Sequence, residues 1–326
     1  MSDISLTASM RSNLLSLQNT QSLMDMTQER LSTGKKVNSA IDNPSSYYAA
    51  QSLTNRADDL SALLDSMGQA IQTIKAADEG IETITTFAQQ AKAVAQSAAD
   101  SADKSEREAY EKQFNEILKQ IDDVAKDSNY KGINLLGGTT NKLTVKFNEK
   151  TDSNSKLDIV GVDASTKGDA NSLNIADAAD WDKVADNIAT LQGAVTTKKA
   201  DYEAAPNDSG AKAAYENAVA ALEAQQAADL AAQNTAIANS ISAVEAAITK
   251  LRSWSSEFGN NYSIVQSRED FTERLINVLT EGADKLTLAD MNEESANMLA
   301  LQTRQQLAIN SLSLASQASQ SVLKLF

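Results

Sequence analysis

The 326-residue chain has no cysteine and no histidine, and it contains only two prolines. Without cysteine it can form no disulfide, no thiolate nucleophile and no zinc-thiolate site. Without histidine it also lacks the commonest general base and metal ligand. We therefore expect a protein that is not an enzyme and that holds no cofactor and no metal ion.

Aromatic residues are scarce, at 5% of the chain against 42% hydrophobic residues. This composition suits helices packed through Ala, Leu and Ile rather than a thick globular core. The net charge of −15 argues against binding to a phosphate backbone. No run of apolar residues is long enough to span a membrane. We expect neither nucleic acid nor a membrane as partner.

The beginning of the chain, MSDISLTASMRSNLLSLQ, lacks the basic head and apolar block of a Sec signal peptide. Export, if it occurs, is therefore expected to use another route. Charge is also unevenly placed: residues 1–94 carry a net −3 and residues 295–326 a net +2, which leaves −14 for residues 95–294. Nearly neutral ends and an acidic middle predict that the ends are buried and the middle is solvated.

The last 44 residues, 283–326, contain neither glycine nor proline, and no acidic residue follows Glu294. Apolar residues recur there at spacings of three and four, which indicates a coiled-coil seam. Burying this seam would contribute on the order of 10 kcal/mol, several times less than ordering the backbone costs. The segment therefore needs partners. The seam comprises Met298, Leu301, Ala308, Leu312, Ala315, Val322 and Phe326, with Gln305 and Ser319 as polar members.

Residues 4–33 predict a second terminal helix, free of glycine and proline, that we expect to pair with the C-terminal one. Apolar residues off its seam, among them Leu15 and Leu23, give it more than one apolar face. Its seam comprises Met10, Leu14, Leu17, Met24 and Leu31, with Gln21 and Gln28 in the gaps.

Two long helices are predicted between these ends, one over residues 47–101 and one ending at Gly282, lying antiparallel. A helix over 47–101 would be about 80 Å long, whereas a compact globule of this size would be about 50 Å across. The sequence therefore predicts an elongated rod. The first seam comprises Leu53, Leu60, Leu64, Met67, Ile71 and Ile74 and is interrupted at Asp78; the second comprises Ile237, Ile241, Val244, Ile248 and Leu251 and is interrupted at Ser255.

The middle of the chain is more varied. We expect a shorter helix over residues 106–126 and a β-hairpin within 142–163, where polar and apolar residues alternate. Residues 177–203 and those from 211 onward predict a helical hairpin, joined by a turn that contains Pro206 and Gly210. The predicted fold class is mainly α: an antiparallel helical rod with paired terminal coiled-coil helices, a small β-hairpin and a helical-hairpin insert.

Several motifs, in order, resemble the bacterial flagellins. They are LSTGKKVNSA at 31–40, DNP at 42–44, AADEG at 76–80, YKGINLL at 130–136, LQ at 301–302 and SVLKL at 321–325. The resemblance covers roughly 1–138 and 235–326. It implies a structural subunit that polymerises into the flagellar filament for swimming motility, with its termini paired in the filament core. The implied organisation is an N-terminal core helix (1–45), a rod domain (46–138 and 235–282), a solvent-facing insert (139–234) and a C-terminal core helix (283–326).

The resemblance also implies partners: further flagellin subunits, an export chaperone on the C-terminal helix, the flagellar export apparatus, and junction and cap proteins. It places the protein outside the cell, in the flagellum. Many flagellins carry an Arg-x-x-x-Leu pair and a Glu that a vertebrate innate receptor reads. Gln90, Val94 and Gln113 stand at those positions here. Because the guanidinium and carboxylate are missing, we expect weak or no receptor activation.

Two alternatives remain open at this stage. A hook–filament junction protein would share similar ends, but the density of flagellin motifs favours the filament subunit. An amphipathic protein of the membrane surface is less favoured, because the terminal helices lack the Lys- and Arg-rich polar face that such proteins use.

Overall fold

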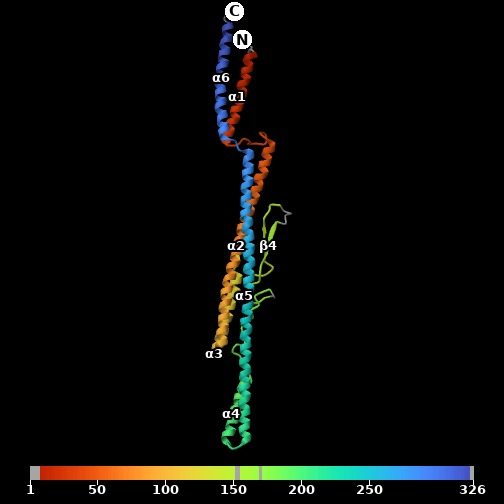
Figure 1. Ribbon diagram of the computed structural model, residues 1–326, viewed down its shortest axis with the longest axis vertical. Helices are drawn as coiled ribbons and strands as arrows, with labels where there is room; N and C mark the ends of the chain where they lie inside the picture. Colours follow the sequence, from red (N-terminus) through yellow and green to blue (C-terminus); the bar gives the residue numbers. More distant parts are fainter. Residues whose placement is uncertain (1–7, 151–154, 169–170, 324–326) are drawn as a thin grey trace. The chain divides into compact units, whose positions relative to one another are not determined.

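A computed structural model describes the backbone of residues 8–150, 155–168 and 171–323, and the side chains between Met10 and Ala318 within them. The mainly helical fold class with a small hairpin is confirmed (Figure 1). The elements are α1 (Ala8–Thr33), α2 (Pro44–Asp100), α3 (Lys104–Asp127), β1 (Asn129–Tyr130), β2 (Ile133–Asn134), β3 (Lys142–Lys146), β4 (Lys156–Val160), α4 (Ile188–Ala204), α5 (Ser209–Thr287) and α6 (Met291–Leu323).

The chain divides into two compact units, one of Met1–Ala62 with Phe271–Phe326 and one of Leu63–Asp270. Helices α2 and α5 each contribute residues to both units. The five domains expected from the sequence have different boundaries, and they stay a prediction.

The larger unit has its core where α2, α3 and α5 pack together, with the β3–β4 hairpin against them (Figure 1). Alanines at Ala77, Ala88, Ala91 and Ala95 of α2 are fully buried, so neighbouring elements approach closely there. Gly80 allows the closest approach, because a Cβ atom built on it would lie 2.2 Å from Ser128 Oγ. The bulky core residues include Met67, Ile74, Ile81, Phe114, Leu118, Ile121, Val244, Leu251 and Phe258.

Residues 177–187, directly before α4, depart from the sequence prediction. We expected a helix from Asp177, but the helix begins at Ile188. Trp181 is instead fully buried against Phe114, with ring centroids 5.1 Å apart. Asn115 of α3 holds the backbone of Ala178 from both sides, accepting from its N–H at 2.7 Å and donating to its C=O at 3.0 Å. Tertiary contacts with α3 therefore replace helical hydrogen bonds in this segment.

The expected helical hairpin of the insert is confirmed. Helix α4 lies beside the first part of α5 (Figure 1), and the two are joined by the turn around Pro206. Near that turn the rings of Tyr202 and Tyr215 stack, with centroids 6.1 Å apart. No residue of α4 is buried, so this hairpin has a thin interface.

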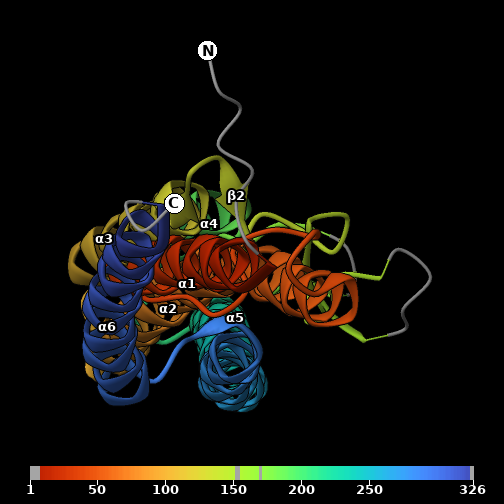
Figure 2. The ribbon, with the colours of Figure 1, turned by 90° about the horizontal axis from the view of Figure 1, so that it is seen from above.

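The smaller unit pairs the two ends of the chain. Helices α1 and α6 lie side by side in both views (Figures 1 and 2), as the sequence predicted. Next to this pair the backbone N–H of Lys36 donates to Thr287 O at 2.7 Å, and that of Ala289 donates to Gly34 O at 3.0 Å. Gly34 has φ +70, which ends α1 in a left-handed conformation. No helix among the described residues is long and apolar enough to cross a membrane.

Gly282 does not end the second long helix, contrary to expectation. It lies inside α5, which continues to Thr287 before α6 begins at Met291. Its lack of a side chain serves packing instead, since a Cβ atom there would lie 3.4 Å from Leu53 Cδ1.

Candidate assembly surface

The inner face of the α1/α6 pair holds most of the residues predicted for the filament core. Leu14 is the exception, with 37% of its surface exposed. Thr20 and Thr27, which the seam prediction omitted, are buried instead. Val322 and Phe326 lie outside the residues whose side chains are described. The half-buried predicted members are Met10, Leu17, Met24, Leu31, Met298, Leu301 and Leu312.

Polar side chains link the two terminal helices across this face. Gln305 Nε2 donates to Gln21 Oε1 at 2.8 Å, so two polar positions of the predicted seams meet. Arg30 Nη1 lies 3.0 Å from Glu294 Oε1, and the Glu294 side chain is only 8% exposed. Polar pairs inside a helical seam fix its register, because a shifted pairing would leave them without partners.

The outer faces of α1 and α6 carry large apolar side chains in solvent. Leu299, Leu307 and Leu314 of α6 are each about two-thirds exposed, at 66%, 65% and 67%. On α1, Leu15 is 60% exposed and Leu23 45%. Several large apolar side chains exposed on one pair of helices indicate an interaction site.

A groove of about 590 Å³ runs along this surface between the two helices. Its apolar lining includes Leu23 and Met26 from α1 and Leu307 from α6, and Arg30 and Arg304 add charge. The groove can therefore bind an apolar side chain, or a helix whose apolar face is flanked by polar residues.

The predicted seam residues of the two long helices are buried or half-buried in the structure. The polar interruptions of the two seams meet as well, since Ser255 Oγ donates to Asp78 at 2.9 Å. The buried members are Leu60, Met67, Ile71, Ile74, Ile237, Val244, Ile248 and Leu251, while Leu53, Leu64 and Ile241 are half-buried.

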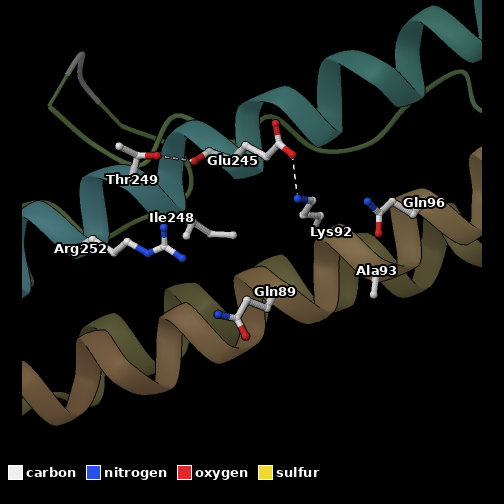
Figure 3. Close-up of a pocket in the computed structure, with 8 residues that line it drawn as sticks. All are labelled: Gln89, Lys92, Ala93, Gln96, Glu245, Ile248, Thr249 and Arg252. Carbon is white, nitrogen blue, oxygen red and sulfur yellow. Dashed lines mark hydrogen bonds and ion pairs between the residues drawn. The ribbon is translucent and has the colours of Figure 1, made fainter.

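A second, polar hollow of about 400 Å³ lies between α2 and α5 in the larger unit (Figure 3). Lys92 of α2 reaches across it to Glu245 of α5, with Nζ 2.7 Å from Oε1. Arg252 also lines this hollow, and it has no ion-pair partner among the described residues.

The residues at the diverged receptor positions lie on the same unit. Gln90 of α2 and Gln113 of α3 are exposed, and Val94 is half-buried against the core. None of the three carries a charge, so this surface offers no charge-assisted hydrogen bond from these positions.

Two carboxyl groups have pKa values shifted by their structural contacts. Hydrogen bonds from Thr144 and Lys142 lower the pKa of Asp158 on β4 to about 2. Burial raises the pKa of Glu111, helped by the nearby carboxylates of Asp182 and Asp180. The described part of the chain contains no group of three or more acidic residues that could hold a metal ion.

Turn and cap chemistry at residues 42–45 is evident from the sequence, but the exposed side chain of Ile41, in the turn formed by residues 38–43, was not predicted. Ile41 in this turn is 93% exposed although its backbone is well held. The sequence signal for an exposed side chain was an apolar residue surrounded by Asn, Ser, Asp and Pro, because turns of this composition lie at the surface.

Paired terminal helices with exposed apolar side chains, together with long helices that pack through apolar seams, are typical of a helical structural subunit. Comparison with known proteins agrees. Residues 4–141 match the bacterial flagellin N-terminal helical region and residues 241–326 the bacterial flagellin C-terminal helical region, together more than half of the chain. The chain belongs to the bacterial flagellin family.

Individual flagellins are similar to this chain over almost its whole length. Flagellin from Brucella melitensis is 28% identical over 320 residues, covering 96% of this chain and 95% of the relative. Flagellin C from Rhizobium meliloti is 27% identical over 310 residues, covering 93% and 92%. Flagellin FljM from Caulobacter vibrioides is 27% identical over 317 residues, covering 96% and 95%. The chain is thus a structural subunit of the flagellar filament.

Proposed function

We propose that the subunit enters the filament through the apolar outer faces of α1 and α6. The observation that carries this proposal is the row Leu299, Leu307 and Leu314, each about two-thirds exposed in the single chain. Burying a leucine side chain contributes about 1.5–3 kcal/mol. Three such side chains on α6 and their counterparts on α1 supply a large part of the free energy of assembly.

The test replaces Leu307 and Leu314 by asparagine and adds the purified chain to filament seeds. Because both side chains are exposed in the monomer, the variant should keep the helical content and melting temperature of the parent. We expect no elongation at concentrations where the parent grows long filaments. Leu230→Asn, at a 47% exposed leucine on α5 within the insert hairpin, is the matched control and should elongate normally. Normal elongation of the Leu307/Leu314 variant would contradict the proposal.

We further propose that an export chaperone covers the same face of α6 before assembly, and that the chain leaves the cell through the flagellar export apparatus. It would then meet junction and cap proteins at the growing end. The support is chemical: an apolar helix face that is exposed until assembly needs cover in the cell. If so, the Leu307/Leu314 variant loses its chaperone complex in co-purification, whereas Leu230→Asn keeps it.

The diverged receptor positions support a weak response from the vertebrate innate receptor. Exposed Gln90 and Gln113 offer no charge to pair with, and half-buried Val94 contributes to the core. A receptor reporter assay with purified monomer checks this, and strong signalling at nanomolar dose would contradict it.

A further inference from the structure

The turn of residues 38–43 holds an apolar side chain rigidly in solvent. Asp42 Oδ2 accepts hydrogen bonds from the backbone N–H of Asn38 at 3.0 Å and of Ser39 at 2.9 Å. Ser39 Oγ donates to the same oxygen at 3.2 Å and accepts from Ile41 N–H at 3.3 Å. These bonds lower the pKa of Asp42, so its carboxylate stays ionised and the turn keeps its shape at neutral pH.

Ile41, at the tip of this turn, is 93% exposed. A β-branched side chain on a fixed backbone loses little conformational entropy on binding. The Ile41 side chain is therefore exposed and held in place, so it could insert into a hollow on another molecule at little entropic cost.

A matching hollow lies on the larger unit, between α2 and α5. It measures about 190 Å³ and is lined by Ile74, Lys75, Asp78, Phe258, Gly259 and Tyr262. Gly259 is an exposed lining residue, and a Cβ atom built on it would meet nothing within 4 Å, so a side chain there would have open space. At about 30 Å³ per water molecule, the hollow holds about six waters. The four side-chain carbons of an isoleucine fit in that volume.

Two charged side chains line the hollow, Lys75 and Asp78, and the Asp78 carboxylate already accepts a hydrogen bond from Ser255 Oγ at 2.9 Å. Lys75 places its Nζ 5.5 Å from the centre of the Tyr262 ring and has no carboxylate partner among the residues described. Beside Ile41, Asp42 uses only Oδ2 for its three hydrogen bonds, which leaves Oδ1 without a donor in the described chain. An isoleucine seated in the hollow would bring these opposite charges to the same rim.

We propose that Ile41 of one subunit inserts into the hollow at Gly259 of a second copy of this chain, with Asp42 opposite Lys75. This inference rests on the proposed filament function. The knob and the hollow are different surfaces of one chain, so the contact is heterologous and repeats from subunit to subunit instead of closing a dimer. That is the kind of contact a helical filament requires.

The test uses the absence of native cysteine. Two chains are made, one with Ile41→Cys and one with Gly259→Cys, and filaments grown from their mixture are oxidised with diamide. We expect a disulfide-linked dimer on a non-reducing gel that contains both chains and that neither chain forms by itself. The control mixture pairs Ile41→Cys with Gly193→Cys, at another glycine with open space around it, in α4, and should give no mixed dimer.

Filament growth by the unsubstituted chain distinguishes failure of this contact from failure of the proposed filament function. Filaments that grow without a 41–259 crosslink overturn this contact and leave the filament function standing. If the unsubstituted chain does not elongate from seeds at all, the proposed function itself is wrong.

A second measurement does not depend on cysteine. Ile41→Asn removes the knob, and Gly259→Leu fills the hollow with a better helix former. Each should raise the concentration of unassembled chain at steady state by roughly 10-fold or more. Leu230→Asn should leave that concentration unchanged. Unchanged values for both Ile41→Asn and Gly259→Leu would overturn the proposal.

Discussion

At the scale of single residues, Arg107 shows how one buried cation joins three parts of the larger unit. Its side chain is 3% exposed. Nε donates to Ser101 O at 2.8 Å, Nη1 to Gln233 Oε1 at 2.9 Å and Nη2 to Asn234 Oδ1 at 2.8 Å. Gln233 in turn donates to Lys183 O at 2.7 Å. The residue after α2, the first third of α5 and the segment before α4 are therefore linked through one guanidinium.

Replacing Arg107 by methionine should lower the free energy of unfolding by about 2–4 kcal/mol. The volume is roughly kept, but the substitution removes the donor from Oε1 of buried Gln233, from the carbonyl of half-buried Ser101 and from Oδ1 of exposed Asn234. Urea denaturation of the monomer measures the change. Arg252→Met is the matched control, since Arg252 is exposed, and should cost less than about 0.5 kcal/mol. Equal losses in the two variants would show that the Arg107 hydrogen bonds add nothing to stability.

Glu111 lies half-buried on α3 and accepts a hydrogen bond from Trp181 N–H at 3.0 Å. Burial, together with Asp182, Asp180 and Glu108, raises its pKa above 4.5, and only the Trp181 hydrogen bond opposes this. The folded state therefore binds this proton more tightly than the unfolded state. Below pH 4.5 Glu111 is protonated in both states and does not lower the free energy of unfolding. As the pH rises through the pKa of the folded state, the ionised carboxylate lowers the free energy of unfolding increasingly.

Glu111→Gln should accordingly raise the melting temperature at pH 7 by a degree or two, because glutamine keeps the acceptor and loses the charge. The difference from the parent should shrink as the pH falls toward 4.5. Thermal scans of both monomers between pH 4 and pH 8 measure it. A variant that is less stable at pH 7, or a difference that does not depend on pH, would contradict the assignment.

Periodicity reports which face of a helix is buried, and the predicted seam residues of α2 and α5 are buried or half-buried, while their roles in the filament stay a prediction. The two polar gaps read in the long seams, Asp78 and Ser255, even proved to be hydrogen-bonded partners. Arg107 could not be found in this way. Its partners Gln233 and Asn234 lie 126 and 127 positions away, and no local pattern connects residues so distant.

At the scale of elements, the insert hairpin differs from the core it extends. Helix α4 has no buried residue, whereas α3 buries Phe114, Leu118 and Ile121 against α2 and α5. Local opening is easiest where few apolar contacts are lost. Hydrogen exchange followed by mass spectrometry should therefore show amides of 190–203 exchanging at least 100-fold faster than those of 114–125. Equal protection in the two stretches would contradict this difference in local stability.

Element boundaries were predictable where local chemistry sets them. Asn43 caps α2, accepting from Ser46 N–H at 3.1 Å, directly before Pro44 in the first turn. The start of α4 was missed because tertiary contacts override propensity. Ala178 and Trp181 read as part of an alanine-rich helix, but α3 binds their backbone groups through Asn115 and Glu111. The end predicted for the second long helix at Gly282 was wrong for a related reason. The glycine allows close packing against Leu53 and does not end the helix.

At the scale of the whole molecule, charge opposes assembly. Each subunit brings a net −15, of which −14 lies in residues 95–294. Packing many copies together therefore accumulates repulsion, which salt screens. The Debye length falls from about 30 Å at 0.01 M to about 8 Å at 0.15 M ionic strength.

Seeded elongation should consequently speed up by roughly 10-fold between 0.01 M and 0.15 M salt, measured by light scattering at constant pH. A charge-reduced chain provides the matched control. Glu203→Gln, Glu216→Gln and Glu223→Gln remove three exposed negative charges from the insert hairpin without touching a buried residue. Because less repulsion is left to screen, this chain should elongate faster at low salt and respond less to added salt. If salt slows elongation of the parent, attraction between opposite charges dominates the contacts, and pairs such as Asp42 with Lys75 outweigh the net repulsion between subunits.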